Sequence, residues 1–465
     1  MPTSPFSPRR LFPLVVLWLL TGPALAQDVP APLAKLELED GDTLVFLGDS
    51  ITHQGLYTQY VESYFLTRFP AKTIRFHNAG VGGARCWDAL QRFDRDVAAY
   101  NPKYVTVLLG MNDGGYTPFN DSIFQTYRKD MLEVLERIEA TGATPILMTP
   151  SMFDARAARL GRSWLNEEGK TYYNSVLAYY GAWLRDVATE KGYGFVDMWS
   201  PMNAITFEQR KSDPKFTMIQ DAVHPGPAGQ VVMAAAILND LDVPRGLSSI
   251  RIRRDRQGRI HGDRSQGGAL ADLTHADDAV SFTWTAESLP WAVPEEAALG
   301  AELTNLANRW NAETLEVQGL GAGTYALTID GEEVGRYPAR ALARGIRLQG
   351  NTKTPQYRQA LDVATINHHK SRGPVQHLRD AWGQFQTYGR VRQASEGNPN
   401  DENLKEQLAN LEKAVADLDA RVEQFNAAIQ EVDRELQEKR QPRPRRYALS
   451  KVDGAAPAED ENSAE

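Results

Sequence analysis

Short apolar runs alternate with longer amphipathic stretches between residues 40 and 245. Each apolar run ends in a polar or glycine-rich turn, and the runs are TLVFLGD, TIRFHNAG, YVTVLLGMND, TPILMTPS and GFVDMWS. The stretches between them have apolar residues at helical spacing, as in 56–69, 122–140 and 171–190. This alternation predicts a parallel sheet with helices on both faces. Ligands bind beyond the carboxyl ends of the strands in such sheets, so we expect the functional residues in the loops that follow the strands.

The pattern changes after Pro244. From about residue 250 to 350 the helical period fades, and the stretch TLEVQGLGAGTYALTIDGEEVGRY predicts two or three antiparallel strands. The stretch SFTW predicts another strand. We therefore expect a small β-rich accessory domain over 250–350, followed by a helical region over 352–440.

Residues 401–440 carry a heptad pattern over roughly five heptads. Apolar residues alternate at spacings of four and three, at Leu404, Leu408, Leu411, Val415, Leu418, Val422, Phe425, Ile429, Val432 and Leu436. The pattern predicts a coiled coil that pairs two copies of the chain, or a helix that packs back on residues 353–394 as a hairpin. A homodimer follows only if the stripe is not covered within the chain. The Pro- and charge-rich end, 441–465, is expected to be disordered.

The first residues have the features of a signal peptide. Arg9 and Arg10 precede an apolar run from Leu11 to Leu20, and an A-x-A site predicts cleavage near Ala26. The apolar run is too short to span a bilayer comfortably, and no later segment approaches 18 apolar residues. We expect export to the periplasm or the extracellular space without stable membrane insertion.

Composition adds two exclusions. The 465 residues are 42% hydrophobic and 24% charged, with a formal net charge of -9, which argues against binding of nucleic acid. The single cysteine, Cys86, excludes a disulfide within the chain.

The chain has the groups that serine hydrolysis requires: a hydroxyl, a base held in the right tautomer, and donors for an oxyanion. Ser50 follows the first predicted strand, Gly83 the second and Asn112 the third. Asp221 and His224 lie in DAVHPGPAGQ, where a short turn can place the carboxylate on one ring nitrogen and leave the other free.

Four sequence blocks, in this order, resemble those of the SGNH (GDSL-type) hydrolase superfamily of esterases and lipases. The blocks are Gly48-Asp49-Ser50, Asn78 to Gly83, Gly110 to Asp113 and Asp221 to His224. Each block alone is weak, but their order and their places after predicted strands are specific. The resemblance covers about 205 residues, less than half of the chain.

The resemblance implies a fold and a set of roles. The fold is an α/β, flavodoxin-like three-layer α/β/α sandwich with a five-stranded parallel sheet over residues 40–245, followed by the β-rich and helical regions. Ser50 is the implied nucleophile, His224 the base and Asp221 its orienting partner. The N–H groups of Ser50 and Gly83 and the side chain of Asn112 form the implied oxyanion hole. This mechanism needs no metal and no organic cofactor.

Three further residues are expected near the substrate. His53 lies one helical turn beyond Ser50, beside the nucleophile rather than facing it. Arg85 follows the second block and Tyr116 follows the third, where both can line a cleft.

We predict an exported serine esterase that removes a short acyl group, such as acetyl, from a carbohydrate or similar substrate. Lipase, lysophospholipase and thioesterase activities of the same family remain alternatives. A further alternative is an exported glycan-binding or assembly protein with a relic hydrolase domain. The sequence lacks the paired motifs of a dinuclear metallophosphoesterase, and Gly48 to Thr52 does not match the G-x-S-x-G motif of α/β-hydrolases.

Overall fold

Five strands form a parallel sheet in the order β2-β1-β3-β4-β5. This computed structural model describes residues 30–161, 167–255, 257–276 and 278–452. The strands are β1 (Thr43–Gly48), β2 (Arg75–Gly80), β3 (Tyr104–Leu108), β4 (Thr144–Met148) and β5 (Gly194–Val196). Every residue of β1 and β3 is buried, as expected for parallel strands covered on both faces. The predicted α/β fold with a five-stranded parallel sheet is confirmed.

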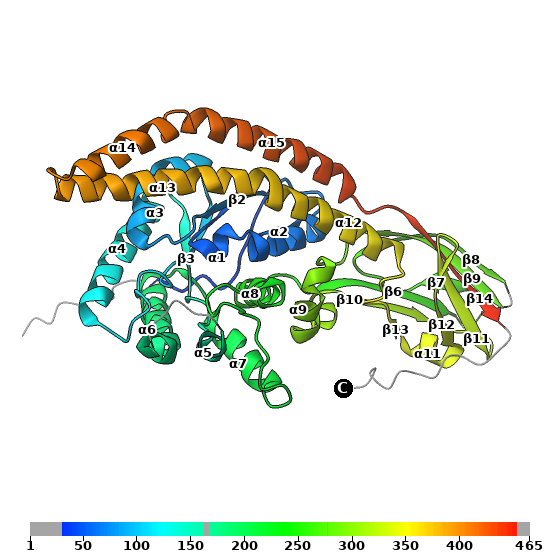
Figure 1. The fold of residues 1–465 in the computed structure, drawn as a ribbon. Coiled ribbons are helices and arrows are strands. Elements are labelled where there is room, and N and C mark those ends of the chain that lie inside the picture. The colour runs from blue at the N-terminus through cyan, green and yellow to red at the C-terminus, as the bar shows by residue number, and fades with distance from the viewer. Residues whose placement is uncertain (1–29, 162–166, 256, 277, 453–465) are drawn as a thin grey trace, which may run out of the picture.

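Helices connect these strands and cover the sheet (Figure 1). They are α1 (Ser50–His53), α2 (Leu56–Arg68), α3 (Cys86–Asp96), α4 (Asp121–Ala140), α5 (Ala155–Leu160), α6 (Glu167–Lys191), α7 (Trp199–Gln209) and α8 (Pro227–Asp240), with a 3-10 turn η1 (Ala98–Tyr100). Among the described residues, none of the helices has the length and hydropathy needed to span a bilayer. The predicted signal peptide, residues 1–26, lies outside the described residues.

A second core lies between two further sheets, with strand orders β13-β10-β6-β7 and β12-β11-β14-β9-β8. Their strands are β6 (Gly246–Arg254), β7 (Ile260–Gly262), β8 (Gly268–Ala276), β9 (Ala279–Ala286), β10 (Ala312–Val317), β11 (Thr324–Ile329), β12 (Glu332–Pro338), β13 (Ile346–Arg347) and β14 (Arg445–Val452). The short helices of this region are η2 (Glu295–Ala297), α9 (Ala298–Leu303), α10 (Leu306–Trp310) and α11 (Ala339–Arg344). The β-rich region expected over 250–350 is therefore a two-sheet unit, and one of its strands comes from residues far beyond 350.

The expectation that 441–465 is disordered is wrong for residues 445–452. These residues form β14, which pairs with β9 on one side and β11 on the other. Tyr447 and Leu449 point into the second core and are at most 1% exposed. Their alternation with the more exposed Arg446, Ala448 and Ser450 is the ordinary pattern of a strand with one buried face. Residues 453–465 lie outside the described residues.

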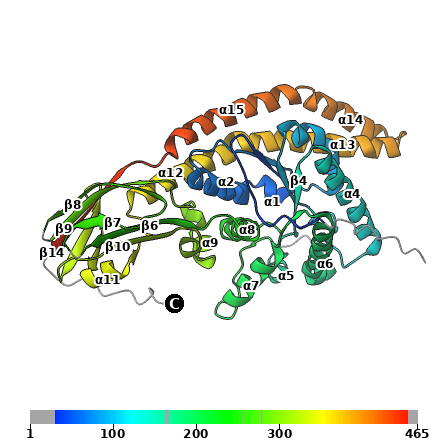
Figure 2. The same cartoon turned by 180° about the vertical axis from the view of Figure 1, so that it is seen from behind.

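The helical region folds as a hairpin, which we call the C-terminal hairpin (residues 355–439). One limb consists of α12 (Pro355–Lys370), a π turn (Ser371–Val375) and α13 (Gln376–Gly397), and the other of α14 (Glu402–Val415) and α15 (Leu418–Lys439). The hairpin lies along the parallel-sheet domain, and its ends lead into and out of the β-rich unit (Figures 1 and 2).

The heptad stripe of residues 401–440 is partly covered within the chain, more in α15 than in α14, where none of its residues is buried. It runs through α14 and α15, which pack on α12 and α13. Leu418 and Leu436 are at most 1% exposed, and Phe425 packs against the main core. This is the hairpin arrangement, and a homodimer through the half-buried part of the stripe in α14 stays a prediction.

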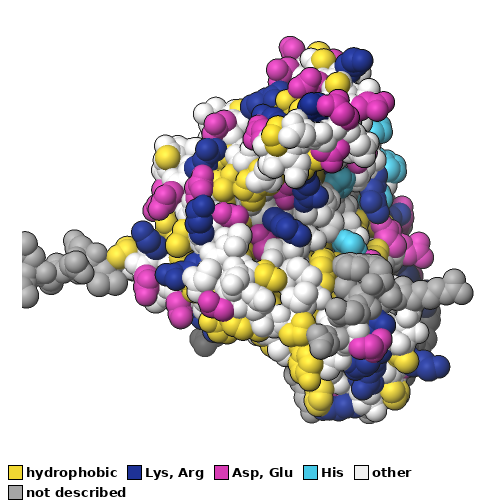
Figure 3. Space-filling model, turned by 60° about the vertical axis from the view of Figure 1, so that its left-hand side comes forward, with side chains coloured by type: hydrophobic (Ala, Val, Ile, Leu, Met, Phe, Trp, Pro, Cys, Tyr) yellow, Lys and Arg dark blue, Asp and Glu magenta, His cyan; other side chains and the backbone are white. Residues whose placement is uncertain are grey.

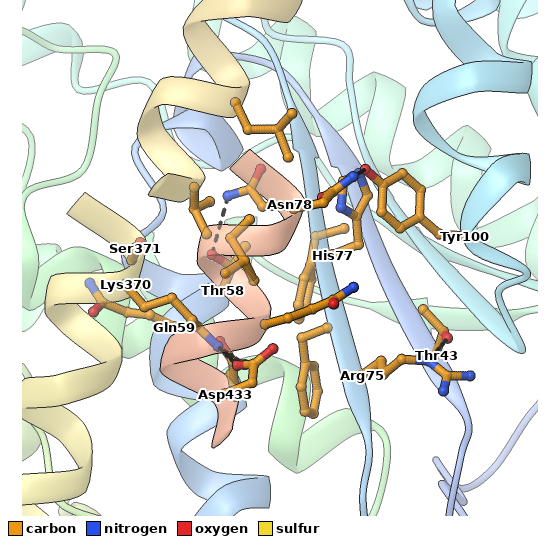
Figure 4. A pocket seen from close by; sticks show the side chains of 18 residues that line it. Thr43, Thr58, Gln59, Arg75, His77, Asn78, Tyr100, Lys370, Ser371 and Asp433 are labelled. Carbon is orange, nitrogen blue, oxygen red and sulfur yellow. Dashed lines mark hydrogen bonds and ion pairs between the residues drawn. The ribbon is translucent and has the colours of Figure 1, made fainter. Parts of the chain in front are cut away.

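A buried ion-pair network fastens this hairpin to α2. The Nζ of Lys370 lies 2.8 Å from Asp433 of α15, and it also contacts Glu62 of α2. Burial lowers the pKa of Lys370, but the two carboxylates outweigh it, so the net pKa is raised and the ammonium stays charged. The network borders a small cavity of about 180 Å³, with Lys370 and Ser371 on one side and Arg75 and His77 on the other (Figure 4). None of the predicted catalytic residues lines this cavity.

Candidate active site

The predicted site residues come together at the carboxyl edge of the parallel sheet. Ser50 follows β1, Gly83 follows β2, Asn112 follows β3, and Asp221 and His224 precede α8. Adjacent parallel strands end at the same edge, so loops far apart in the sequence meet there.

Ser50 is the first residue of α1, and Asp49 is its N-cap. The buried carboxylate of Asp49 accepts the N–H of Ile51 at 2.9 Å, which fixes the strand-to-helix turn. A Cβ on Gly48 would collide with the side chain of Thr52, so only glycine fits before this turn. Burial raises the pKa of Asp49 to about 7, and the nearby carboxylate of Asp113 adds to the rise. Asp49 is thus a structural cap rather than a free carboxylate.

Ser50, His224 and Asp221 form a hydrogen-bonded chain. The Oγ of Ser50 lies 2.8 Å from Nε2 of His224, and Nδ1 of His224 lies 2.7 Å from Oδ2 of Asp221. A carboxylate at Nδ1 holds the proton there and leaves Nε2 free to accept the serine proton. The arrangement can therefore activate a hydroxyl.

The turn from Asp221 to His224 is stabilised by Asp221 itself. Its Oδ1 accepts the backbone N–H of Val223 at 3.0 Å and that of His224 at 2.8 Å. Burial raises the pKa of Asp221, but the hydrogen bonds from His224 and Val223 outweigh it, so the net pKa is lowered. Ala222 has φ of 76°, an uncommon conformation for a residue with a Cβ. Such local strain persists only where surrounding contacts hold it in place.

Asp154 supplies those surrounding contacts. Its N–H donates to Ala222 O at 2.9 Å, and its buried carboxylate accepts from Arg210 at 2.6 Å and from Thr217 at 2.6 Å. Asp154 therefore ties the segment that leads to Asp221 onto the start of α5.

We expect Asp154→Asn to lower stability by about 1.5–3 kcal/mol, because charged hydrogen bonds become neutral ones and Arg210 loses its counter-ion. Urea denaturation followed by tryptophan fluorescence measures this change. Asp213→Asn, on the exposed part of the same segment, is the matched control and should shift the midpoint little. Equal midpoints for the two variants would contradict the role of Asp154.

Two of the predicted donors, the backbone N–H groups of Ser50 and Gly83, have no hydrogen-bond acceptor among the described residues. Gly83 has φ of 69°, in the left-handed region that favours glycine. Asn112, the third predicted donor, has its Nδ2 3.1 Å from Ala84 O and 3.4 Å from Oδ2 of Asp49.

Tyr116 contacts the side chain of Asn112 and orients its amide. Its hydroxyl donates to Oδ1 of Asn112 at 3.1 Å, which turns the amide nitrogen toward Asp49 and Ala84. The ring of Tyr116 lies 4.8 Å from the ring of Tyr173, measured between centroids.

A cleft of about 810 Å³ opens beside these donors. Arg85, Trp87 and Tyr116 line it, whereas Ser50, Asp221 and His224 are not among its lining residues, so a substrate contact of Arg85 and Tyr116 stays a prediction. Arg390 and Gln393 of α13 also line it, and nothing in the local sequence pointed to them. Basic and acidic side chains are interspersed on the face of the molecule in Figure 3.

His53 points away from the serine hydroxyl. Its Nδ1 accepts the N–H of Gly82 at 3.1 Å, and its Nε2 lies 3.2 Å from Oδ1 of Asp380 on α13. Burial lowers the pKa of His53, and the guanidinium of Arg379 lowers it further. His53 therefore sits as a neutral bridge between the second block and the C-terminal hairpin, outside the set of residues that line the cleft.

Asp113 is the other buried carboxylate near the site. Its Oδ1 accepts the N–H of Cys86 at 2.9 Å, and burial raises its pKa to about 6. Within the described ranges, no group of three or more histidine, cysteine or acidic side chains is arranged to hold a metal ion.

Comparison with known proteins places this site in a family. Residues 46–232 match the model of the GDSL-like lipase/acylhydrolase family. An acetylxylan esterase of Geobacillus stearothermophilus is 26% identical over 231 residues, which is 44% of this chain and 96% of the relative. An uncharacterized lipoprotein of Bacillus subtilis is 36% identical over 74 residues, 16% of this chain and 30% of that protein.

The structural likeness extends beyond the catalytic domain. The structure of a gut microbial diltiazem-metabolizing enzyme superposes with a TM-score of 0.74 at 26% identity, over 90% of this chain and 100% of that one. The β-rich unit and the C-terminal hairpin therefore belong to an architecture that this protein shares with another enzyme.

The fold and the family model define the class: this chain is a carboxylic ester hydrolase. It belongs to the SGNH (GDSL-type) hydrolase superfamily, through the GDSL-like domain of residues 46–232.

Proposed function

We propose that this protein is an exported serine esterase that removes a short acyl group, such as acetyl, from a carbohydrate or similar hydroxylated substrate. The hydrogen-bonded chain from Ser50 through His224 to Asp221, with contacts of 2.8 and 2.7 Å, carries the proposal. The export part rests on the signal-like first 26 residues and has weak support from the similarity to a lipoprotein.

Catalysis begins when His224 Nε2 takes the proton of Ser50 as Oγ attacks the acyl carbon. The carbonyl oxygen becomes an oxyanion, which the N–H groups of Ser50 and Gly83 and the amide of Asn112 stabilise. The imidazolium then gives its proton to the leaving alcohol oxygen, and the ester C–O bond breaks. Water, deprotonated by His224, attacks the acyl-enzyme and releases the acid and Ser50.

The lining of the cleft and the similarity to an acetylxylan esterase both support the proposed substrate class. The cleft beside Asn112 is lined mostly by polar side chains with Trp87 and Tyr116 among them, which suits a hydroxylated ring better than a long acyl chain. The acetylxylan esterase that matches the catalytic domain supports the same choice.

A substrate panel tests this proposal. We expect acetate release from acetylated xylo-oligosaccharides, and turnover of p-nitrophenyl esters that falls as the acyl chain lengthens from acetate to octanoate. Ser50→Ala should release no acetate from either kind of substrate. Faster turnover of octanoate than of acetate would point to a lipase, and acetate release by Ser50→Ala would remove the proposed nucleophile.

A further inference from the structure

Helix α13 of the C-terminal hairpin contacts the loop after β2 at two carbonyl groups. Gln386 Nε2 donates to Gly82 O at 2.9 Å, and Arg390 Nη2 donates to Gly83 O at 2.7 Å. These contacts join residues about 300 positions apart, and Gly82 and Gly83 have no side chains of their own to fix the loop.

A bidentate ion pair fixes the position of Arg390. Its Nε and Nη2 donate to the two carboxylate oxygens of Asp88, each at 2.7 Å. Asp88 lies in the first turn of α3, is 2% exposed, and also accepts the N–H of Arg85 at 2.9 Å. Because the guanidinium is planar, this fork sets the direction in which Nη2 reaches Gly83 O.

His53 contacts the same loop at the backbone N–H of Gly82. Its Nδ1 accepts the N–H of Gly82, so the ring proton of the neutral imidazole lies on Nε2, which faces two groups of α13: the side-chain amide of Gln376 at 2.6 Å and Oδ1 of Asp380 at 3.2 Å. His53 therefore anchors the Gly82 N–H to α13.

These contacts fall on three successive peptide planes. His53 holds the plane between Val81 and Gly82, through the Gly82 N–H. Gln386 holds the next plane through Gly82 O, and Arg390 holds the plane after it through Gly83 O. Since a peptide unit is planar, fixing Gly82 O also fixes the direction of the Gly83 N–H in the same unit.

We propose that α13 completes the catalytic centre, with Gln386 and Arg390 as positioning residues that aim the Gly83 N–H at the oxyanion. This inference rests on the proposed function, because it assumes that Ser50 attacks an ester in front of that N–H. The C-terminal hairpin is thus part of the catalytic apparatus, although the family model ends at residue 232.

Two substitutions test the inference in the full chain, Gln386→Met and Arg390→Met. Loss of an oxyanion donor costs about 10²- to 10³-fold in kcat, so a misdirected donor should cost about 10-fold for each variant. The KM for p-nitrophenyl acetate should stay within about 3-fold of wild type, because the donor acts on the transition state. The inhibition constant of a boronic acid, which forms a tetrahedral adduct on Ser50, should rise by the same factor as kcat falls.

Two residues of the same helix provide matched controls. Arg392 pairs with Glu396 at 3.8 Å and lies over the ring of Tyr388. Gln384 is exposed and accepts from Arg421 at 2.9 Å. Arg392→Met and Gln384→Met should keep wild-type kcat and inhibition constants. Because Arg390→Met also removes the counter-ion of Asp88, which is buried, urea midpoints of both test variants are measured beside kcat, and the kinetic comparison is made at a temperature where each variant is folded.

Wild-type kcat in both test variants would overturn the inference. So would a fall in kcat that the boronic acid does not follow, since that pattern indicates a general loss of structure. These results are distinct from failure of the proposed function, because that failure appears as full turnover in Ser50→Ala. If Ser50→Ala is inactive and Arg390→Met behaves like Arg392→Met, only the inference about α13 fails.

Discussion

Replacing His224 by alanine is expected to lower kcat for p-nitrophenyl acetate by about 10⁶-fold, and Ser50→Ala by a similar factor. The nucleophile and its base act as one unit, since the Oγ of Ser50 has no other base within hydrogen-bond distance than Nε2 of His224, at 2.8 Å, among the described residues. Asp221→Ala should cost about 10⁴-fold, because the imidazole can still accept a proton but loses the group that fixes its tautomer.

The decisive feature of this series is its lack of additivity. The double variant Ser50→Ala/His224→Ala should be no slower than either single variant, because each already removes the whole proton-transfer path. His369→Ala, at an exposed position of α12, is the matched control and should keep wild-type kcat. Stopped-flow and steady-state release of p-nitrophenolate measure all five variants. If His224→Ala kept a tenth of the activity, another group would have to be the base.

The core of the candidate site could be predicted because it depends on local patterns. Four strands or turns with recognisable polar ends supply Ser50, Gly83, Asn112 and the pair Asp221 and His224. Parallel topology forces these ends together, so spacing along the sequence did not matter. The roles of these residues remain predictions, but their proximity is now a structural fact.

Residues outside these patterns could not be found in the same way. Gln386 and Arg390 lie on a helix whose sequence shows only which face is apolar. The sequence does not show that this helix packs on the loop after β2, because that contact depends on the tertiary fold. His53 has the same limitation, because its partner Asp380 is 327 residues away. Strand β14 did leave a weak local signal, since Arg446, Tyr447, Ala448, Leu449 and Ser450 alternate small or polar with large apolar residues, but the Pro- and charge-rich surroundings outweighed it.

The second large effect is expected at Asp96, which joins the catalytic domain to the C-terminal hairpin. Its carboxylate accepts from both terminal nitrogens of Arg379, each at 2.8 Å, and from Arg92 at 2.6 Å. Asp96, Arg92 and Arg379 are at most 1% exposed. Asp96→Asn would leave two buried guanidinium groups without a counter-charge, and we expect it to lower the free energy of unfolding by about 3–5 kcal/mol.

Urea denaturation monitored by tryptophan fluorescence checks this expectation, with Asp94→Asn as the control. Asp94 lies on the same helix, its side chain is 83% exposed, and its pair with Arg137 is 3.7 Å long. The control should change stability by less than about 0.5 kcal/mol. Asp96→Asn/Arg379→Met should be more stable than Asp96→Asn alone, since it removes one uncompensated charge. A double variant less stable than the single one would contradict this charge argument.

The same cluster predicts the direction of the pH dependence. Burial raises the pKa of Asp96, but Arg379, His77 and Arg92 outweigh it and hold the net pKa well below its ordinary value. Burial lowers the pKa of His77 to about 4. A group whose pKa is depressed by folding stabilises the fold above its unfolded pKa, and that stability is lost as pH falls through the folded value. Since unfolded histidine titrates near about pH 6.5 and aspartate near about 3.9, stability should decline from about pH 6.5 toward pH 4 and further below it. Urea midpoints that stay constant from pH 7 to pH 4 would contradict this expectation. Arg379, which pairs with Asp96, and Asp380, which contacts His53, are neighbours on α13. Acid should therefore also loosen the hold of α13 on the loop after β2.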